Sequence, residues 1–359
     1  MVTKTTRLET LRSQMSGVNR DILAKLLEFF HVSKQIGREK DILGLPHLDP
    51  VRESQMLIEI QRLNKGPVSH KIITQIFKDI FKASVDDMGI ETRKRLNINR
   101  GTKSSDLVIH VNDIVIGGGS PVMMAGPCAV ESYEQISETA AFLHSLGVRI
   151  LRGGAFKPRS SPYSFQGLEI EGLKMMRQAA DAHDMIVITE VLDTETVSDV
   201  EAYADIIQIG TRNMHNYSLL KRIGKCKKPV FLKRGLMSTI DEFILAAEYI
   251  YLGGNQQIIL CERGIRTFET QTRNTLDISA VPILKKETTL PVVVDISHST
   301  GRKDIATSMA KAALAAGADG IMLESHINPL AALSDAQQQL NPEEMKKFMD
   351  SIPDYYNLS

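Results

Sequence analysis

Hydrophobic residues in the first quarter of the chain recur every three or four positions, which is the spacing of one face of an α-helix. The first such stretch covers residues 7–40, which corresponds to a helix of about 50 Å at 1.5 Å per residue. A second stretch begins at Asp49–Pro50, an N-cap residue followed by proline, and a third ends near Met88. The pattern predicts an all-α three-helix domain over residues 1–88, whose long first helix needs a second subunit to cover it.

Residues 89–106 are polar and basic, and they predict a linker. After it the pattern changes to short, continuous apolar runs. A small hairpin that turns at Asn112–Asp113 comes first. Eight runs follow, each with a helical segment behind it, and they read VMMAGPC, ILRGG, MIVITEV, DIIQIG, PVFLKRG, QIILCERG, PVVVDISH and GIMLESH.

Apolar runs that alternate with helices in this way are typical of strands in a parallel sheet that is buried on both faces. Eight strand–helix units in roughly 250 residues match a (β/α)8 TIM barrel. The predicted fold is therefore α/β, with a barrel over residues 107–359 behind the helical domain. An open, doubly wound sheet is the weaker alternative, because the chain lacks a GxGxxG turn.

The composition narrows the classes of function. Of the 359 residues 43% are hydrophobic, and 43 basic residues balance 43 acidic ones, so nothing marks the whole chain for nucleic acid or an anionic membrane. No apolar run approaches the roughly 18–20 residues that span a bilayer, and the N-terminus lacks the apolar core of a signal peptide. Three scattered cysteines do not form a disulfide framework. We expect a cytoplasmic protein.

The carboxyl ends of the predicted strands, where barrel enzymes carry their function, hold side chains that suit a metal ion. Cys128 follows the first strand, His298 ends the seventh and Glu324 ends the eighth, and these strands are neighbours in a closed barrel. Asp335, in the segment after the eighth strand, is able to join them. A thiolate, an imidazole and two carboxylates suit a divalent transition metal better than Mg²⁺ or Ca²⁺.

Basic side chains follow the other strands. In Ile150–Ser160, ILRGGAFKPRS, three cations stand beside two glycines, and arginine matches phosphate and carboxylate groups in a bidentate geometry. The whole set comprises Arg152, Lys157, Arg159, Arg212, Lys233 and Arg263. Each of these residues and of the metal-ligand candidates, taken singly, also fits a structural role as an ion-pair partner or buried group. Together they favour a small polyanionic substrate, because burying so many like charges without a ligand is costly.

Eight motifs extend across residues 107–345: GPCAVES, LRGGAFKPRSSPYSFQG, IQIGTRNMHN, LKRGL, ILCERGIRTFE, TRNTLDISA, DISHSTGR and LSDAQQQL. With them the chain resembles the 3-deoxy-D-arabino-heptulosonate 7-phosphate (DAHP) synthases of type I beta. That family condenses phosphoenolpyruvate with erythrose 4-phosphate and releases phosphate, the first step of the shikimate pathway to aromatic amino acids. The octulosonate 8-phosphate synthases share the barrel, but they carry Ala-Asn-Arg where this chain has Pro-Arg, and with a purely structural helical domain they are the alternative.

The resemblance implies roles for individual residues. Its metal ligands match Cys128, His298, Glu324 and Asp335. Its groups that hold phosphoenolpyruvate match Arg152, Lys157, Arg212, Lys233 and Arg263. The loop that takes the sugar phosphate matches Lys-Pro-Arg-Ser, with Arg159 and Ser160; many relatives have Thr at the latter position. We expect Lys157 to act as general acid at the aldehyde and Glu190 to manage the water. The implied cofactor is a divalent metal ion, with Mn as the first choice and Fe, Co or Zn as alternatives.

Residues 7–88 resemble the all-helical chorismate mutases, which form intertwined dimers and rearrange chorismate to prephenate. The residues that match the mutase pocket are Arg12 (from the partner subunit), Lys40, Asp49, Arg52, Glu53 and Ser84. A partner-supplied arginine predicts a homo-oligomer, either a dimer or a tetramer.

Two positions depart from the mutase pattern. Phe29 replaces an arginine that contacts a substrate carboxylate, and Met88 replaces the hydrogen-bonding Gln or Glu at the breaking ether oxygen. Losing one such directed group costs about 10²–10³ in rate. Three hypotheses follow for this domain: a weak mutase, a module that senses chorismate or prephenate and regulates the barrel, or a dimerisation bundle. The sequence favours the two non-catalytic ones and does not name the metal or the regulating end product.

Overall fold

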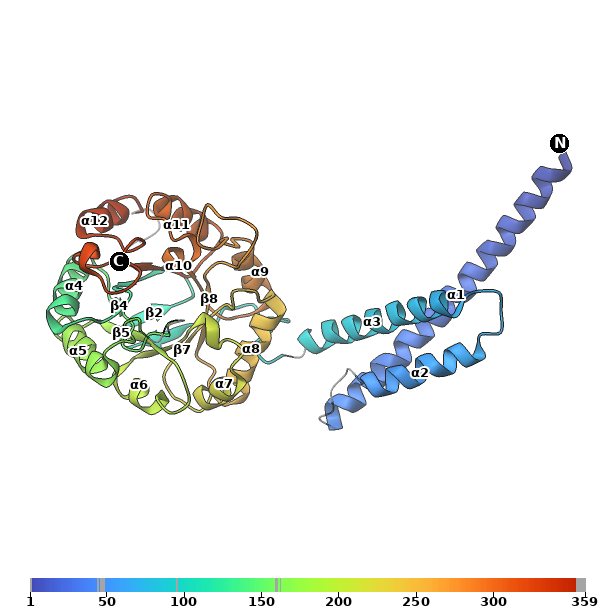
Figure 1. Ribbon diagram of the computed structural model, residues 1–359, viewed down its shortest axis with the longest axis horizontal. Coiled ribbons are helices and arrows are strands. Elements are labelled where there is room, and N and C mark those ends of the chain that lie inside the picture. The colour runs from blue at the N-terminus through green and yellow to red at the C-terminus, as the bar shows by residue number, and fades with distance from the viewer. Residues whose placement is uncertain are drawn as a thin grey trace. The chain divides into compact units, whose positions relative to one another are not determined.

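The computed structural model describes residues 2–43, 45, 49–94, 96–158, 161 and 163–352. Two compact units make up the chain, Met1–Leu96 and Asn97–Ser359 (Figure 1). The first is helical and the second contains all the strands. No helix in the described ranges combines the length and apolar character needed to cross a membrane.

The helical unit contains α1 (Val2–Leu43), α2 (Pro50–Leu63) and α3 (His70–Lys94). As the sequence predicts, Asp49 caps α2, and its carboxylate accepts a hydrogen bond from the Arg52 backbone N–H at 2.9 Å. The third helix runs six residues past its predicted end and takes up the first part of the predicted linker. No proline interrupts the sequence there, and a single glycine costs a helix only about 1 kcal/mol.

The rest of the predicted linker packs on the barrel unit instead of spanning open solvent. Ile98 is buried, and the backbone and side-chain amides of Asn97 both donate to Glu248 of the barrel. Asp106 accepts from Arg100 and from Lys285, the latter at 2.7 Å. The polar residues of this segment thus form ion pairs and hydrogen bonds, several of them with the outer helices of the barrel.

All eight predicted apolar runs contain a strand, and the strands close into a parallel barrel in the order β10-β3-β4-β5-β6-β7-β8-β9. The predicted (β/α)8 barrel is confirmed. Its strands are β3 (Val122–Gly126), β4 (Ile150–Arg152), β5 (Ile186–Val191), β6 (Ile206–Ile209), β7 (Val230–Lys233), β8 (Ile258–Glu262), β9 (Val292–Asp295) and β10 (Gly320–Glu324). Closure pairs Glu324 with Gly126, so the last strand ends beside the first.

Helices surround the barrel as an outer ring (Figure 1). They are α4 (Tyr133–Ser145), α5 (Glu169–Asp181), α6 (Val197–Tyr203), α7 (Tyr217–Ile223), α8 (Ile240–Leu252), α9 (Ala280–Glu287), α11 (Ala306–Ala315) and α12 (Pro342–Asp350). Three short pieces lie in the loops after strands, η1 (Thr211–Asn213), α10 (Ile296–Thr300) and η2 (Pro329–Ala331). The helix α10 was not predicted; Asp295 caps it, and it carries His298.

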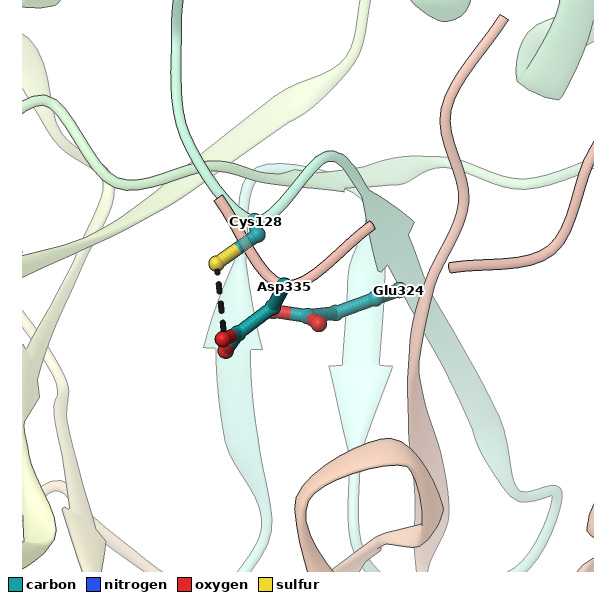
Figure 2. A group of neighbouring side chains, drawn as sticks. All are labelled: Cys128, Glu324 and Asp335. Atoms are coloured by element: carbon teal, nitrogen blue, oxygen red, sulfur yellow. Dashed lines mark hydrogen bonds between the residues drawn. The ribbon is translucent and has the colours of Figure 1, made fainter. Parts of the chain in front are cut away.

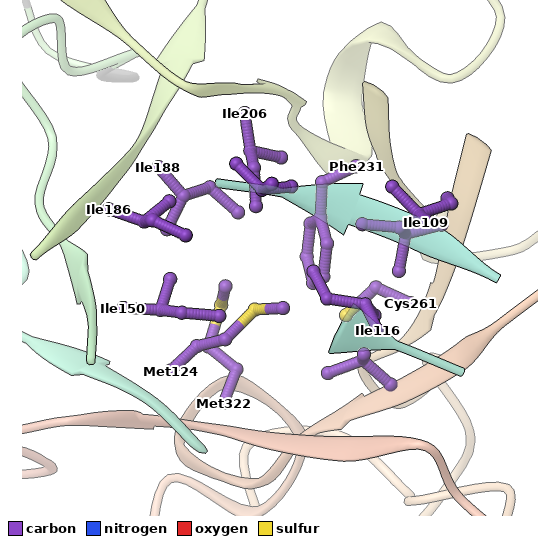
Figure 3. Packing of buried hydrophobic residues seen from close by; sticks show 13 residues of the cluster. Ile109, Ile116, Met124, Ile150, Ile186, Ile188, Ile206, Phe231, Cys261 and Met322 are labelled. Carbon is purple, nitrogen blue, oxygen red and sulfur yellow. The ribbon is translucent and has the colours of Figure 1, made fainter. Parts of the chain in front are cut away.

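The predicted hairpin, β1 (Ile109–Val111) and β2 (Ile114–Ile116), is present, and Asn112 turns it in the left-handed region at φ 53°. Its inward side chains pack against residues of the barrel interior such as Met124 and Phe231 (Figure 3). Apolar side chains therefore fill the amino-terminal half of the barrel. The polar cavity described below lies at the carboxyl ends of the strands.

Candidate functional site

A polar cavity of about 190 Å³ lies at the carboxyl ends of the strands, where the sequence predicts the site. Five of the six predicted cations line it, namely Arg152, Lys157, Arg212, Lys233 and Arg263, together with Glu190, His298 and Asp335. The sixth, Arg159, and the predicted phosphate ligand Ser160 lie outside the described residues. The barrel thus collects positive charge from strands that are far apart in the sequence.

Three of the four predicted metal ligands lie together at one side of this cavity. One ligand atom from each of Cys128, Glu324 and Asp335 lies within 4.8 Å of the other two. Figure 2 shows the three side chains side by side. The fourth, His298, places Nε2 at 3.3 Å from Glu324 Oε1. The thiol and the two carboxylates lie within reach of one ion, and the imidazole borders Glu324. These four donors, here called the ligand cluster, fit a divalent transition metal ion.

Local backbone geometry brings these groups together. Gly126, at the end of β3, has φ 155°, and a Cβ there would lie 1.9 Å from the carbonyl oxygen of Arg152. Only glycine lets the two neighbouring strands lie this close before the chain continues to Cys128. Asp335 adopts φ 46°, a left-handed conformation that aspartate tolerates better than most residues.

A fully buried carboxylate connects the metal-ligand cluster with the cations. Asp295 lies 2.7 Å from His298 Nδ1 and 2.5 Å from Lys233 Nζ. Burial opposes ionisation of Asp295, but its close contacts with His298 and Lys233 outweigh it and hold its pKa well below the usual value. An ionised carboxylate beside Nδ1 favours the tautomer with the proton on Nδ1, and Nε2 of His298 then keeps a lone pair that could bind a metal ion.

Two cations face the ligands directly. Arg152 donates to Glu324 at 2.8 Å and to the carbonyl of Pro127 at 2.8 Å, and the ion pair is almost entirely buried. Lys157 places Nζ at 2.8 Å from the carbonyl oxygen of Cys128 and at 3.1 Å from its Sγ. The lysine therefore borders both the ligand cluster and the cavity.

The sequence model of the DAHP synthetase I family matches residues 96–356, almost three quarters of the chain. The chain belongs to the DAHP synthetase I family. The predicted enzyme class, a 3-deoxy-7-phosphoheptulonate synthase of the transferase type, is confirmed with it. Residues 11–87 match the chorismate mutase type II model.

Two relatives separate the predicted class from its alternative. The phospho-2-dehydro-3-deoxyheptonate aldolase of Thermotoga maritima is 54% identical over 262 residues, 71% of this chain and 78% of that one. A 2-dehydro-3-deoxyphosphooctonate aldolase of Desulfosudis oleivorans is only 30% identical over 263 residues, 68% of this chain and 94% of that one. A crystal structure of the Thermotoga DAHP synthase superposes with a TM-score of 0.70 at 53% identity, covering 72% of this chain and 76% of that one.

The candidate metal ligands differ in how firmly they hold a proton. Burial, reinforced by the charge of Glu324 and opposed by Lys157, raises the pKa of Cys128 to about 11. The pKa of Asp335 is about 2, because Arg273 and His298 outweigh the effect of burial. Burial lowers the pKa of His298, which favours the neutral imidazole. At neutral pH the thiol is therefore the one of these candidate ligands that would have to lose a proton to bind a metal ion.

We expect metal binding to release about one proton, from Cys128, at neutral pH. Because the thiol is protonated below its pKa of about 11, the apparent affinity should rise with pH, about tenfold per unit between roughly pH 6 and 8. Calorimetric titration in two buffers of different ionisation enthalpy measures the released protons. No proton release in wild type, or unchanged release in Cys128→Ala, contradicts the assignment.

The predicted water-managing residue, Glu190, faces the cavity from the end of β5. Gln208 of the neighbouring strand donates to its Oε2 at 3.5 Å. Gly210 leaves the room for this carboxylate, because a Cβ there would lie 1.8 Å from Glu190 Oε1. The backbone of Gly210 (φ −70°) would accept alanine, so the glycine serves the carboxylate and not a turn.

We expect Gly210→Ala to displace the Glu190 carboxylate without straining the backbone. Positioned acid–base groups contribute about 10²–10⁴ in rate, so kcat should fall at least about 10²-fold with a smaller change in KM. Steady-state kinetics test this, with Glu190→Ala as the matched variant. The double variant should be no slower than Glu190→Ala alone. An unchanged kcat in Gly210→Ala would remove the carboxylate from the reaction.

Sequence reasoning missed two cations of the cavity, Arg266 and Arg273. Arg273 donates to Asp335 at 3.2 Å, whereas the guanidinium of Arg266 makes no ion pair with any acid that the structure describes. Both belong to motifs already quoted, GIRTFE and TRNTLD, but they follow no strand directly. An isolated antiparallel β-bridge between Ile265 and Thr275 folds this loop back over the cavity. The local sequence does not reveal this fold of the loop.

In the helical unit, a second cavity of about 290 Å³ contains five of the six predicted mutase-like residues: Lys40, Asp49, Arg52, Glu53 and Ser84. Arg12 lies exposed on α1 and does not line this cavity. Phe29 does, and its ring stacks on Phe81 at 6.1 Å between centroids. The side chain of Met88 lies outside the described part of the chain.

Proposed function

We propose that the barrel condenses phosphoenolpyruvate with erythrose 4-phosphate in a metal-dependent reaction, giving DAHP and phosphate. One observation carries the proposal: seven lysine and arginine side chains line a single cavity beside the group of Cys128, Glu324 and Asp335, with His298 3.3 Å from Glu324. Two phosphates and a carboxylate would repel one another in one site without such positive charge. The proposed ligands are Cys128, His298, Glu324 and Asp335, with Mn as the first choice of metal and Fe, Co or Zn as alternatives.

The bound metal ion would supply Lewis acidity to the aldehyde of erythrose 4-phosphate. C3 of phosphoenolpyruvate attacks the aldehyde carbon, and a carbon–carbon bond forms. Lys157, beside the ligand cluster and on the cavity wall, gives a proton to the aldehyde oxygen. Glu190 takes a proton from the water that adds at C2. The resulting hemiketal phosphate then loses phosphate and leaves the ketone of DAHP.

The cations have a separate role in binding. Arg152, Lys157, Arg212, Lys233 and Arg263 hold the carboxylate and phosphate of phosphoenolpyruvate in this proposal. Arg159 and Ser160 hold the sugar phosphate. Arg212 and Arg266 make no ion pair with a described acid, so both guanidinium groups are available to an anion.

The test is turnover of phosphoenolpyruvate by the chelator-treated full-length protein before and after metal is restored, with release of phosphate and formation of DAHP as readouts. Erythrose 4-phosphate is compared with arabinose 5-phosphate, the sugar of octulosonate synthesis. We expect metal-dependent turnover with the four-carbon sugar. Full activity after chelation contradicts the metal, and preference for the five-carbon sugar contradicts the substrate.

For the helical unit we propose that residues 1–88 bind chorismate or prephenate and regulate the barrel of residues 107–359, with 89–106 as the connection. The support is a cavity in which Lys40 and Arg52 face apolar side chains, while Phe29 stands where the mutases carry an arginine. That replacement disfavours catalysis but leaves the Arg52 guanidinium in the cavity for a carboxylate.

Chorismate consumption by the full-length chain, beside a Phe29→Arg, Met88→Gln double variant, separates catalysis from sensing. We expect the wild-type protein not to consume chorismate and the double variant to gain this activity. Rapid chorismate turnover by the wild type would make the chain bifunctional. Inhibition of DAHP formation by prephenate, lost in Arg52→Ala, separates sensing from a purely structural bundle.

We also propose a homo-oligomer, a dimer or a tetramer, in which the partner subunit supplies Arg12 to the helical cavity. The support is a row of exposed apolar side chains along α1, comprising Leu8, Leu11, Met15, Val18 and Ile22. A long apolar stripe of this kind is stable in water only when another surface covers it. Size-exclusion chromatography with light scattering measures the oligomeric state of the full-length protein. A monomer would contradict the proposed homo-oligomer.

A further inference from the structure

Three consecutive glutamines, residues 337–339, lie in the segment between β10 and α12 that carries Asp335. Gln338 and Gln339 are buried, whereas Gln337 is exposed. Burying an amide side chain is unfavourable unless its donors and acceptor are all satisfied. The partners that satisfy these two amides are the groups of the ligand cluster.

Gln338 contacts both carboxylates of the cluster. Its Nε2 donates to Glu324 Oε2 at 2.5 Å and lies 3.3 Å from Asp335 Oδ2. Its Oε1 accepts a hydrogen bond from Arg273 at 2.7 Å, and the same guanidinium reaches Asp335. One side chain thus sets the spacing of two carboxylates that would otherwise repel each other, and it leaves Glu324 Oε1 directed at His298.

Gln339 holds the third ligand from the other side. Its Oε1 accepts the backbone N–H of Cys128 at 2.8 Å, and its Nε2 donates to the carbonyl of Ser334 at 2.8 Å. Ser334 directly precedes Asp335. The amide therefore joins the loop after β3, which presents the thiol, to the segment after β10, which presents the carboxylate.

We propose that Gln338 and Gln339 are positioning residues that set the relative places of Cys128, Glu324 and Asp335 for a metal ion. The proposal rests on the metal dependence proposed above. An amide suits this task because it donates to a carboxylate and accepts from an arginine or a backbone N–H at the same time. It also carries no charge, so it adds no repulsion to a site that collects a cation and two carboxylates.

The test uses metal-free, full-length protein and measures metal binding, not turnover. Calorimetric titration with Mn²⁺ gives the affinity, and the absorption band of a thiolate–Co²⁺ complex reports contact with Cys128. Gln338→Met and Gln339→Met keep the size of the side chain and remove its hydrogen bonds. We expect each to weaken Mn²⁺ binding about 10–100-fold, the usual effect of groups that orient metal ligands. Gln337→Met, the exposed neighbour, is the matched control and should leave affinity and band unchanged.

Thermal unfolding of the metal-free variants shows whether the fold survives. If Gln338→Met does not fold, Gln338→Asn replaces it, since its shorter amide cannot reach both carboxylates and adds no apolar group. If the folded variants keep the Mn²⁺ affinity and the thiolate–Co²⁺ band of the wild type, the positioning role is overturned while the metal proposal stands. A wild type that binds no metal ion overturns both, and loss of affinity in Gln337→Met as well overturns the assignment to the buried pair.

Discussion

Cys128→Ala is expected to lose tight metal binding and, with it, metal-dependent DAHP formation. The thiol is fully buried at the meeting point of Glu324, Asp335 and Lys157, and alanine offers no donor there. Groups that only orient ligands already affect affinity about 10–100-fold, so losing a ligand should exceed that range. Mn²⁺ titration, the thiolate–Co²⁺ band and steady-state turnover are the measurements.

A second buried cysteine, Cys261, supplies the control for this variant. Cys261 is also fully buried, but it packs among apolar residues of the barrel interior and does not belong to the group of Cys128, Glu324 and Asp335. Cys261→Ala should keep the thiolate–Co²⁺ band and the Mn²⁺ affinity, although a small cavity costs some stability. Full metal-dependent turnover by Cys128→Ala would show that the thiol is not a metal ligand.

Asp295→Ala is expected to destabilise the barrel by about 3–5 kcal/mol, the usual cost of leaving one member of a buried ion pair uncompensated. The carboxylate is completely buried, and the substitution leaves Lys233 buried without its partner. His298 loses the acceptor that fixes its ring at the same time. Denaturant-induced unfolding measures the free energy of unfolding. Titration with Mn²⁺ measures whether the loosened His298 ring weakens metal affinity.

Adding Lys233→Met to Asp295→Ala separates charge from packing. The double variant should recover part of the lost stability, because no unpaired charge remains in the interior. It should recover no activity, since Lys233 lines the substrate cavity. If the double variant loses as much stability as Asp295→Ala and Lys233→Met lose together, the two residues are not coupled.

Most elements of the fold follow from local sequence. Each barrel strand is an apolar run of the correct length, and the alternation with helices leaves few topologies for eight of them. The end of α3 was misjudged because a polar, basic composition near Lys94 is equally compatible with a surface helix and with a linker. The helix α10 is too short to show a period, so its cap at Asp295 was not recognised.

The candidate ligands were predictable because three of them, Cys128, His298 and Glu324, lie within three residues of a strand end. In a barrel the position along the sequence then translates directly into position at the mouth. Asp335 is different. It lies eleven residues beyond β10, and only the path of that loop, with its left-handed turn at Asp335, returns the carboxylate to the cluster.

By itself, then, the sequence determined the strands, the helices, the strand-end cations and the family, because these depend on short-range patterns and on motifs. Tertiary structure alone decided that Asp295 joins His298 to Lys233, that Gln338 and Gln339 contact Glu324, Asp335 and the backbone of Cys128, and that Arg266 and Arg273 reach the cavity. These contacts join segments of different loops and strands. Their geometry depends on barrel closure and loop paths, which no local pattern of residues encodes.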